Sequence, residues 1–261
     1  MQLLICGPGR LGGAIADAAV TAGWPPPVLV GRGAGPARFA SGRPVDVAID
    51  ASAGAAVAAN LADGLGAGHR RFLLAATGWD ADLPRVRRLL LDHDAAAIVA
   101  PNLSLGAALF ARLVEVAAAW YARADGFEPS IVEWHRRGKA DRPSGTARAL
   151  AHRVATADPR WSVSADADAN DTRPGEAGLA RRPLEVAGIR AGVAPGTHLV
   201  TFDGPGECVE LRLAARDRSA YADGALAAAR WLDREHRSPG LHPFDAVVDD
   251  LLSPAPAAIL A

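Results

Sequence analysis

One stretch of the sequence gathers side chains that could carry out acid–base chemistry on an anionic substrate. From Glu133 to Ala147 it reads Glu-Trp-His-Arg-Arg-Gly-Lys-Ala-Asp-Arg-Pro-Ser-Gly-Thr-Ala. His135 can donate a proton near neutral pH, as a general acid must. Lys139 is the only lysine among 28 basic residues, and its compact ammonium differs in kind from a guanidinium. We interpret both as catalytic candidates; the alternative is that one lysine survives by chance.

The end of the same stretch predicts the start of a helix. Ser144 or Thr146 can cap a helix that follows Pro143, and the first N–H groups of a helix attract anions. The neighbouring Arg136 and Lys139 add positive charge. A substrate carboxylate would bind at such a place. The alternative is a solvated basic loop followed by an ordinary helix cap.

A second pattern, near the amino terminus, indicates dinucleotide binding. The sequence Gly-Pro-Gly-Arg-Leu-Gly at residues 7–12 matches G-x-G-x-x-G, between an apolar strand at Gln2–Cys6 and a helix-forming segment at Ala14–Ala22. In this motif the first glycine makes a tight turn, the second lets the backbone approach a pyrophosphate, and the third lets the helix pack closely. The alternative is a generic glycine turn.

The position that should read the ribose of the cofactor is not acidic. An Asp or Glu about 20 residues after the motif binds the ribose hydroxyls of NAD, whereas this chain has Val-Gly-Arg-Gly at residues 30–33. The guanidinium of Arg32 suits a 2′-phosphate. This predicts a preference for NADPH, with NADH as the alternative, unless Arg32 is only a solvated loop charge.

The elements that must position these residues fall into two groups. Over the first hundred residues, short apolar strands alternate with helical segments, which predicts βαβ units, a parallel sheet and ligands at its carboxyl edge. The expected strands are Gln2–Cys6, Val28–Val30, Val45–Ile49, Phe72–Ala76 and Ala96–Ala100. The expected helices are Ala14–Ala22, Ala53–Leu61 and Leu83–Asp92.

The rest of the chain has an α+β pattern. Helices are expected at Leu105–Ala122, Thr146–Ala155, Ala222–Arg234 and Phe244–Leu252, and strands at Ser130–Trp134, Leu184–Ile189, His198–Phe202 and Cys208–Leu213. The polar segment 162–178 is predicted to be an exposed loop, and the tail from Ser253 to be loose. Trp79, Trp134 and Trp231 are expected in the core, because large aromatic side chains are mostly structural.

The stretch from Glu133 to Ala147 resembles the signature of the dihydrodipicolinate reductase family, the 4-hydroxy-tetrahydrodipicolinate reductases of bacterial lysine and diaminopimelate synthesis. That signature is a Glu, two His, a Lys and then Asp-x-Pro-Ser-Gly-Thr-Ala. The resemblance covers nearly the whole chain, because weaker segments follow in family order. These are the glycine loop, Asp46–Ser52, Thr77-Gly78, residues 101–106, Ile189–His198, Gly204–Glu207, Arg218–Gly224 and Leu241–Leu252.

The resemblance implies a reduction of 4-hydroxy-tetrahydrodipicolinate to tetrahydrodipicolinate by NADPH or NADH. His135 matches the general acid, and Lys139 the catalytic or substrate-orienting lysine. The implied substrate-binding residues are Arg136, Ser144, Gly145 and Thr146. With the glycine loop and Arg32, the expected cofactor-binding residues are Gly7, Gly9, Arg10, Leu11, Gly12, Arg32, Ser52, Thr77, Gly78, Pro101, Asn102 and Leu103. No metal ligands are expected.

The resemblance also implies the fold and the assembly. Residues 1–104 with 219–261 would form a Rossmann-like dinucleotide-binding domain of the α/β class. Residues 105–218 would form an α+β domain with a mixed sheet that binds the substrate and mediates oligomerisation. A small dicarboxylate would bind between the domains, and homotetramers would form through the substrate-domain sheets.

Four departures from the family pattern leave the substrate open. Arg136 stands in place of the second histidine, Ala75-Ala76 in place of Gly-Thr, and Arg212-Leu213 in place of Thr-His. The acidic residues that the family usually has near Val193 and Thr197 are absent. The chain could therefore be a paralogous reductase acting on a different cyclic imine or enamine carboxylate. An amino-acid dehydrogenase and a non-catalytic NADPH-binding protein are further alternatives.

The composition excludes other classes of protein. The net charge of -1 gives no electrostatic basis for general binding to nucleic acids or acidic membranes. Cys6 and Cys208 cannot make a disulfide framework. No apolar run reaches the ~18 residues needed to span a bilayer, and the first residues lack the basic start of a signal peptide. We therefore expect a cytoplasmic protein.

Overall fold

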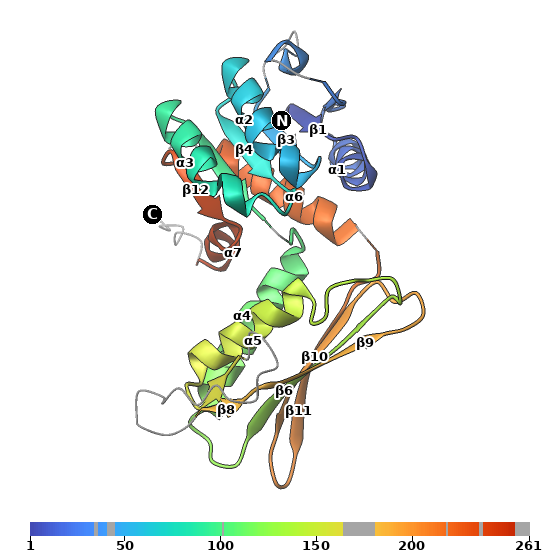
Figure 1. Cartoon of the computed structure of the whole chain (residues 1–261), viewed down its shortest axis with the longest axis vertical. Coiled ribbons are helices and arrows are strands. Elements are labelled where there is room, and N and C mark those ends of the chain that lie inside the picture. The colour runs from blue at the N-terminus through green and yellow to red at the C-terminus, as the bar shows by residue number, and fades with distance from the viewer. Residues whose placement is uncertain are drawn as a thin grey trace, which may run out of the picture. The chain divides into compact units, whose positions relative to one another are not determined.

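The computed structural model describes residues 1–33, 36–40, 45–100, 102–163, 181–217, 219–234 and 237–253. The chain divides into two compact units (Figure 1). The first comprises Met1–Leu105 and Arg218–Ala261, and the second comprises Gly106–Asp217. Each unit is described by itself below.

The first unit is built on a six-stranded parallel sheet, as the alternating pattern predicted. Its strand order is β12-β5-β4-β3-β1-β2. The strands are β1 (Leu3–Cys6), β2 (Val28–Val30), β3 (Val47–Asp50), β4 (Arg71–Leu74), β5 (Ala96–Val99) and β12 (Gly240–Pro243). Strands β1 and β3 are buried at every position, which is why they read as continuous apolar runs rather than alternating ones.

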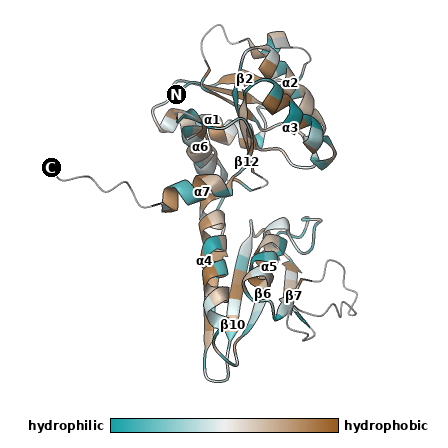
Figure 2. Cartoon of the chain, turned by 90° about the vertical axis from the view of Figure 1, so that its left-hand side faces the viewer, coloured by the Kyte–Doolittle hydropathy of each residue, from teal (hydrophilic) through white to brown (hydrophobic). Residues whose placement is uncertain are grey.

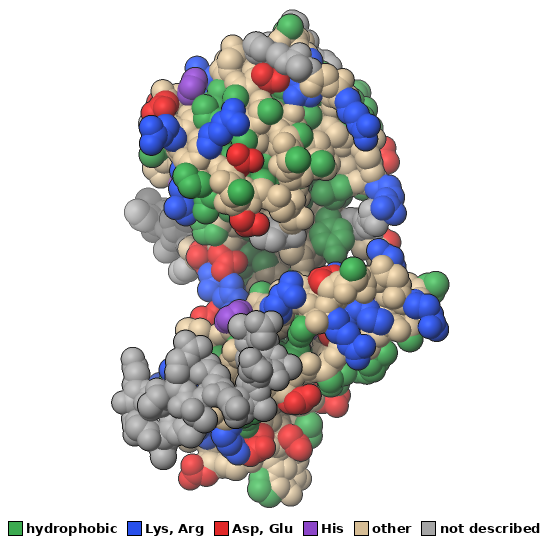
Figure 3. Space-filling model, in the orientation of Figure 1, with side chains coloured by type: hydrophobic (Ala, Val, Ile, Leu, Met, Phe, Trp, Pro, Cys, Tyr) green, Lys and Arg blue, Asp and Glu red, His purple; other side chains and the backbone are tan. Residues whose placement is uncertain are grey.

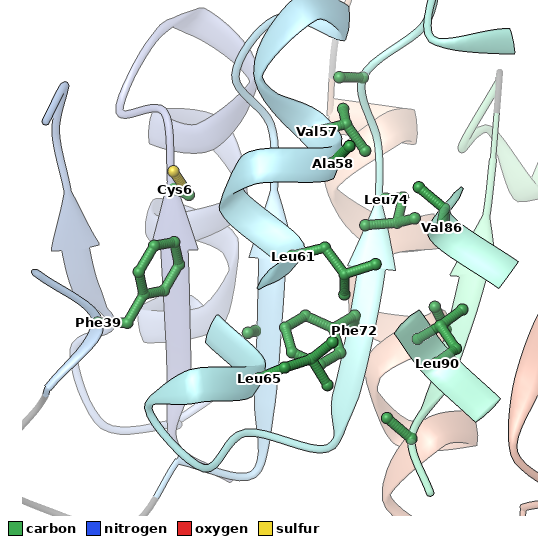
Figure 4. Packing of buried hydrophobic residues seen from close by; sticks show 14 of the residues in the cluster. Cys6, Phe39, Val57, Ala58, Leu61, Leu65, Phe72, Leu74, Val86 and Leu90 are labelled. Atoms are coloured by element: carbon green, nitrogen blue, oxygen red, sulfur yellow. The ribbon is translucent and has the colours of Figure 1, made fainter. Parts of the chain in front are cut away.

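Helices cover both faces of this sheet. They are α1 (Arg10–Thr21), α2 (Val57–Gly66), α3 (Leu83–Asp92), α6 (Ser219–Asp233) and α7 (Asp245–Leu252), with short 3₁₀ turns η1 (Pro36–Phe39), η2 (Gly54–Ala56) and η3 (Asp80–Asp82). On one face, Leu61 and Leu65 of α2 pack against Phe72 of β4 (Figure 4). Helix α6 packs against α1 and against β3, β4 and β5. The result is an α/β unit with its strand ends free to carry loops.

The second unit is a four-stranded mixed sheet with two helices. The strands are β6 (Glu128–His135), β9 (Glu185–Arg190), β10 (Thr197–Asp203) and β11 (Cys208–Ala214), in the order β11-β10-β6-β9. Strand β9 runs parallel to β6, and the other two pairs are antiparallel. The helices are α4 (Leu105–Tyr121) and α5 (Gly145–Ala157), and β7 (Trp161–Ser162) and β8 (Arg182–Pro183) form a separate two-stranded ribbon.

Both helices of the second unit share a hydrophobic core with one face of its sheet. Phe110 and Val114 of α4 and Leu150 of α5 pack with Ile131 of β6 and Val200 of β10. Figure 2 shows that α4 is apolar along most of its length. Because side chains alternate along a strand, every second residue of β6 and β10 points toward this covered face.

The covered face changes character at one end. Along β6 it presents Ile131, Glu133 and His135, all buried. On β10, His198 pairs directly with Glu133 and is buried as well. Titratable side chains therefore replace apolar ones where β6 leads into the loop before α5.

Several features differ from the sequence-based expectations. Strand β12 was not predicted, because a four-residue edge strand ending in proline gives no apolar signal. The β7–β8 ribbon was also missed. Trp79 and Trp231 are buried as predicted, whereas Trp134 is half-buried. Most of the predicted loop at 162–178 and the tail beyond Ser253 lie outside the described residues.

The surface mixes charges of both signs. On the face shown in Figure 3, arginine and lysine side chains are interspersed with aspartate and glutamate. Among the described helices, none combines the length and the apolar character needed to cross a membrane.

Candidate active site

The stretch that suggested acid–base chemistry joins the end of β6 to the start of α5. His135 is the last residue of β6, and α5 begins at Gly145 with Ser144 as its N-cap. The Ser144 Oγ accepts a hydrogen bond from the Ala147 N–H at 3.2 Å, which satisfies one of the free donors of the first turn. The predicted cap is therefore present.

Glu133 is the centre of this arrangement. Its side chain is fully buried, and Oε1 accepts hydrogen bonds from the Ser144 N–H at 2.9 Å and from Arg190 Nη2 at 2.7 Å. Its Oε2 lies 3.0 Å from His135 Nδ1. Burial by itself would raise the pKa of Glu133, but the donors from Ser144 and Arg190 and the charge of His135 outweigh it and lower the pKa. Glu133 is thus held as a carboxylate.

His135 is buried between this carboxylate and a second histidine. The His135 and His198 rings meet edge to face with their centroids 5.3 Å apart. Burial lowers the pKa of His135, and the positive charges of Lys139 and Arg190 lower it further, whereas Glu133 opposes the shift. The protonated form of His135 is therefore supported mainly by the Glu133 carboxylate.

His198 has a different environment although it lies beside His135. Burial, and then the charge of His135, lower its pKa to about 4. A histidine with this pKa is neutral at physiological pH. His198 can therefore pack against His135 without adding charge to the site.

Lys139 already holds a carboxylate. Its Nζ lies 2.6 Å from Asp141 Oδ1, and the Gly145 N–H at the start of α5 donates to Asp141 Oδ2 at 3.3 Å. The hydrogen bond from Lys139 lowers the pKa of Asp141. An ammonium and a helix N-terminus converging on one carboxylate form an anion-binding site, and here the anion is internal.

The structure places the four expected substrate-binding residues in different environments. Arg136 and Gly145 are exposed, Thr146 is half-buried, and Ser144 is buried. The Ser144 N–H donates to the buried carboxylate of Glu133. At this helix start, Lys139 and the Gly145 N–H both contact Asp141.

In the first unit, the glycine loop has the geometry that a dinucleotide motif needs. Gly7 has a φ of +88°, and a side chain there would meet the backbone of Ser52 at 2.6 Å. A Cβ at Gly12 would lie 2.3 Å from the Gly7 carbonyl oxygen, so only glycine lets α1 pack so close to the turn. Gly9, the N-cap of α1, faces open space. An anionic group can therefore approach the start of α1.

The other expected cofactor residues lie on loops at the carboxyl ends of the strands. A Cβ at Gly54 would lie 2.3 Å from the Thr77 carbonyl oxygen, so the loops after β3 and β4 touch. Thr77 and Gly78 are exposed there. Asp50 at the end of β3 accepts hydrogen bonds from the Ser52 N–H and Oγ. These contacts bring the loops after β1, β3 and β4 to one edge of the sheet.

The two arginines after β2 differ in their environments. Arg32 is exposed, directly beyond Val30. Arg38 donates to the Gly31 carbonyl oxygen at 3.2 Å and pairs with Asp63 at 3.4 Å. Arg38 is therefore engaged within the protein, and Arg32 is the guanidinium exposed at the end of β2.

The remaining expected cofactor residues are distributed over the same unit. Arg10 is exposed and Leu11 half-buried at the start of α1. Leu103 is buried, and Asn102 accepts a hydrogen bond from the Ser104 N–H at 2.9 Å. Pro101 lies outside the described residues.

Sequence reasoning missed three residues of the site in the second unit: Glu133, Arg190 and His198. Glu133 was visible two residues before His135, a spacing that places both on one face of a strand. Arg190 and His198 join the site only through strand pairing, opposite His135 and Glu133 respectively. No spacing along the chain reveals that register.

The same cluster has side chains of types that also bind metals. Glu133, His135 and His198 each present a ligand atom, and these atoms lie within 4.8 Å of one another. A divalent cation would have to compete with Arg190, which already binds Glu133, and with the nearby positive charge of Lys139. The cluster of Glu133, His135 and His198 is therefore better suited to bind a proton than to bind a divalent metal ion.

Comparison with known proteins identifies similar chains. Residues 106–248 match the family model described as dihydrodipicolinate reductase, C-terminus. A 4-hydroxy-tetrahydrodipicolinate reductase of Thiobacillus denitrificans is 36% identical over 176 residues, 67% of this chain and 63% of that protein. One from Archaeoglobus fulgidus is 36% identical over 177 residues, 67% of this chain and 65% of that protein. These alignments span less than two thirds of the relatives' own length.

Solved structures support the fold. A dipicolinate-bound dihydrodipicolinate reductase from Paenisporosarcina sp. TG-14 superposes with a TM-score of 0.69 at 20% identity, covering 93% of this chain and 97% of the other. A probable dehydrogenase from Thermotoga maritima gives a TM-score of 0.52 at 10% identity, covering 96% and 93%. At these identities the similarity concerns the fold alone.

Proposed function

The chain belongs to the dihydrodipicolinate reductase family, and from this premise we propose that it reduces 4-hydroxy-tetrahydrodipicolinate to tetrahydrodipicolinate with a nicotinamide cofactor. The reaction would serve lysine and diaminopimelate synthesis. In balanced form, the hydroxylated substrate, one reduced nicotinamide dinucleotide and one proton give tetrahydrodipicolinate, the oxidised dinucleotide and water. A bound cofactor would supply the hydride, and the protein must bind the substrate's carboxylates and provide the proton.

The observation that carries this proposal is the anion site beside a buried histidine. Lys139 and the Gly145 N–H already converge on a carboxylate, and the same short loop connects them to His135. A substrate carboxylate can take the place of the Asp141 carboxylate, because both are anions of the same geometry. The substrate ring would then lie within reach of an acid that is shielded from bulk water.

His135 would donate the proton that balances hydride addition. Glu133 supports the protonated imidazole by its charge, while burial limits the range of pH over which that form persists. General acids contribute about 10²–10⁴-fold to rates when they are positioned well. Once His135 has given up its proton, the adjacent carboxylate favours its reprotonation from solvent.

For the cofactor we propose NADPH. The open cradle at Gly9 and the close packing at Gly7 and Gly12 are compatible with a pyrophosphate at the start of α1. Arg32 is exposed at the end of β2, and Arg38 is engaged with Asp63. We therefore assign recognition of a 2′-phosphate to Arg32.

The direct test is a cofactor oxidation assay with the purified protein. The substrate would be formed in the cuvette from aspartate semialdehyde and pyruvate by a synthase, with NADPH and NADH in parallel. We expect oxidation that depends on the synthase and is faster with NADPH at low concentration. Arg32→Ser should raise the KM for NADPH about tenfold and leave that for NADH unchanged, since it removes one charge-assisted contact. Binding of NADPH without turnover would contradict the proposal.

A second candidate is a reductase for a related cyclic imine or enamine carboxylate. Arg136 favours this candidate, because its exposed guanidinium stands where the family has its second histidine. A guanidinium at this position would bind a carboxylate through two hydrogen bonds. Arg136→His separates the two candidates. If it raises activity on 4-hydroxy-tetrahydrodipicolinate substantially, the natural substrate of this chain is a different one.

A further inference from the structure

We propose that Glu133 is a positioning residue for His135. Its carboxylate sets the orientation of the His135 ring and determines which ring nitrogen is protonated, and it also links His135 to the start of α5. The inference deepens the proposed function, on which it rests for the role of His135 in turnover. The part that concerns the imidazole itself can be measured without any reaction.

The two oxygens of Glu133 have different partners. Oε1 accepts the Ser144 N–H and Arg190 Nη2 at 2.9 and 2.7 Å, whereas Oε2 lies 3.0 Å from His135 Nδ1. Two donors on Oε1 fix the plane of the carboxylate, so Oε2 is held toward the imidazole. A small rotation of the ring aligns an Nδ1–H with this oxygen. The carboxylate therefore selects the tautomer that carries its proton on Nδ1.

When the tautomer with its proton on Nδ1 is fixed, Nε2 is the nitrogen that remains available for proton transfer. A carboxylate on one ring nitrogen stabilises the doubly protonated imidazole, so Nε2 carries the proton that can be transferred. Ser144 is the N-cap of α5, so the acid and the anion-binding helix start share one buried carboxylate. Movement of either one would disturb the other.

Unpaired buried atoms also cluster around this carboxylate. Six buried side-chain nitrogen or oxygen atoms among the described residues lack a hydrogen bond, and four belong here. They are Glu133 Oε2, His135 Nδ1, Arg190 Nε and His198 Nδ1. Two of them, Glu133 Oε2 and His135 Nδ1, lie 3.0 Å apart without hydrogen-bond alignment and are each other's nearest partner. Buried polar atoms that lack a hydrogen bond are costly and need an explanation. Their concentration in one place separates this cluster from ordinary core packing.

Charged and titratable groups face His135 from every neighbouring element. Glu133 lies on β6, Arg190 on β9 and His198 on β10, while Lys139 and Asp141 lie in the loop before α5. Glu133 is the largest of the influences that favour the protonated form of His135. Removing its charge should therefore shift the titration of His135 to lower pH, with the other groups unchanged.

Two glycines leave space for the pair. A Cβ at Gly188 would lie 3.0 Å from Glu133 Oε1, and a Cβ at Gly196 would lie 2.9 Å from His135 Nε2. Both distances are shorter than ordinary contacts. The sheet is therefore built to admit these two side chains at the end of its covered face.

The first experiment is nitrogen NMR of the wild-type protein with labelled histidine. Above its titration midpoint, we expect His135 to be protonated on Nδ1. In Glu133→Gln, the amide can donate to Nδ1, so the proton should move to Nε2 and the midpoint should fall by about one pH unit. Glu210→Gln, on the exposed side of β11, is the matched control and should change neither. A wild-type His135 protonated on Nε2 would overturn the proposal even if the variant fails to fold.

The second experiment is the pH profile of the reductase reaction. In Glu133→Gln, kcat should fall about 10- to 1000-fold, and the fall of kcat/KM at high pH should begin at lower pH. The dissociation constant for NADPH should stay within twofold, because the nucleotide motif lies in the other unit. Glu133→Asp should recover part of the activity. A profile that keeps its shape while kcat falls would show a merely structural role and would reject the inference.

The two experiments separate this inference from the proposed function. If the wild-type protein has the expected tautomer but does not turn over the substrate, the proposed function fails and the role of Glu133 stands. If the enzyme is active and the nitrogen spectrum of His135 is the same in Glu133→Gln, the proposed function stands and the role of Glu133 fails.

Discussion

At the scale of residues, His135 and His198 differ in their partners. Both are buried and belong to adjacent strands, and their rings are 5.3 Å apart. His135 lies 3.0 Å from a carboxylate that supports its charge. His198 lies against His135 itself, whose charge lowers its pKa further. The first is suited to carry a proton, and the second to remain neutral.

Replacing His135 should impair chemistry and leave cofactor binding intact. We expect His135→Gln to lower kcat about 10²–10⁴-fold, the usual contribution of a general acid, with an unchanged dissociation constant for NADPH. Steady-state kinetics and nucleotide titration measure the two effects. His152→Gln on the exposed side of α5 is the control. Unimpaired turnover by His135→Gln would show that His135 is not the general acid.

His198 should make the stability of the protein depend on pH. Its pKa is about 4 in the folded state and 6.5 when unperturbed, so below pH 6.5 the unfolded chain binds a proton that the folded protein does not. Stability is therefore lost as the pH falls from 6.5 to 4, by about 3 kcal/mol from this group. Urea unfolding should show this additional loss in the wild type and not in His198→Gln. Identical pH dependence would place His198 in a more polar environment.

The sequence predicted which residues belong to the site better than it predicted their hydrogen-bond partners. His135, Lys139 and the cap at Ser144 follow from local spacing, because they lie within one continuous stretch. Arg190 could not be found in this way, because it meets Glu133 only through the pairing of β6 with β9. The hydrogen bond from the Ser144 N–H to Glu133 could not be predicted for the same reason. A buried acceptor from a neighbouring strand is invisible in the pattern of a loop.

At the scale of elements, the start of α5 is the place where the residues proposed for binding and for catalysis meet. Its first N–H groups attract anions, and its N-cap is tied to β6 through Glu133. The loop between them returns Asp141 to the helix start, where it pairs with Lys139. The aspartate of this loop thus occupies the position that we propose for a carboxylate of the ligand.

Removing the charge of Asp141 should strengthen the binding of a dicarboxylate. In Asp141→Asn, Lys139 no longer pairs with an internal anion, so a ligand need not displace one. We expect pyridine-2,6-dicarboxylate to bind about fivefold more tightly by calorimetry, the magnitude of a partly exposed ion pair. Asp203→Asn, at the far end of β10, removes the same charge elsewhere and should have no effect. Weaker binding by Asp141→Asn would mean that Asp141 orients Lys139 for the ligand.

Element prediction succeeded where a segment has a strong apolar pattern. The four inner strands of the parallel sheet, β1, β3, β4 and β5, are buried on both faces and give continuous apolar runs, so they were found. Strand β12 pairs only with β5 in the sheet, and its own side chains are only half-buried or exposed. Such a strand depends on its neighbour rather than on its sequence.

At the scale of the whole molecule, the residues that we propose for two tasks lie in different units. The nucleotide motif and Arg32 lie in the first unit, and His135, Lys139 and the start of α5 lie in the second. Under the proposed function, the second unit supplies both substrate binding and proton transfer from one sheet and one helix. The other face of that sheet takes part in neither of these tasks.

We predict that this second face mediates self-association. Opposite the covered core it presents Val132 and Trp134 of β6, Leu199 of β10 and Ile189 of β9, which is 38% exposed. Apolar side chains on an uncovered sheet face favour burial against a second copy. Light scattering after gel filtration should give about four times the chain mass of 26.9 kDa, as the family resemblance implies.

A charge placed on that face should break the assembly. Ile189→Arg would bury an unpaired cation in the interface, which costs several kcal/mol, so a smaller species should result. Leu113→Arg on α4, where Leu113 is 61% exposed, introduces the same charge on an apolar position away from the sheet and should leave the mass unchanged. If Leu113→Arg dissociates the protein and Ile189→Arg does not, self-association uses α4. If the wild-type protein has the mass of a single chain, the sheet face does not mediate self-association, and the prediction is wrong.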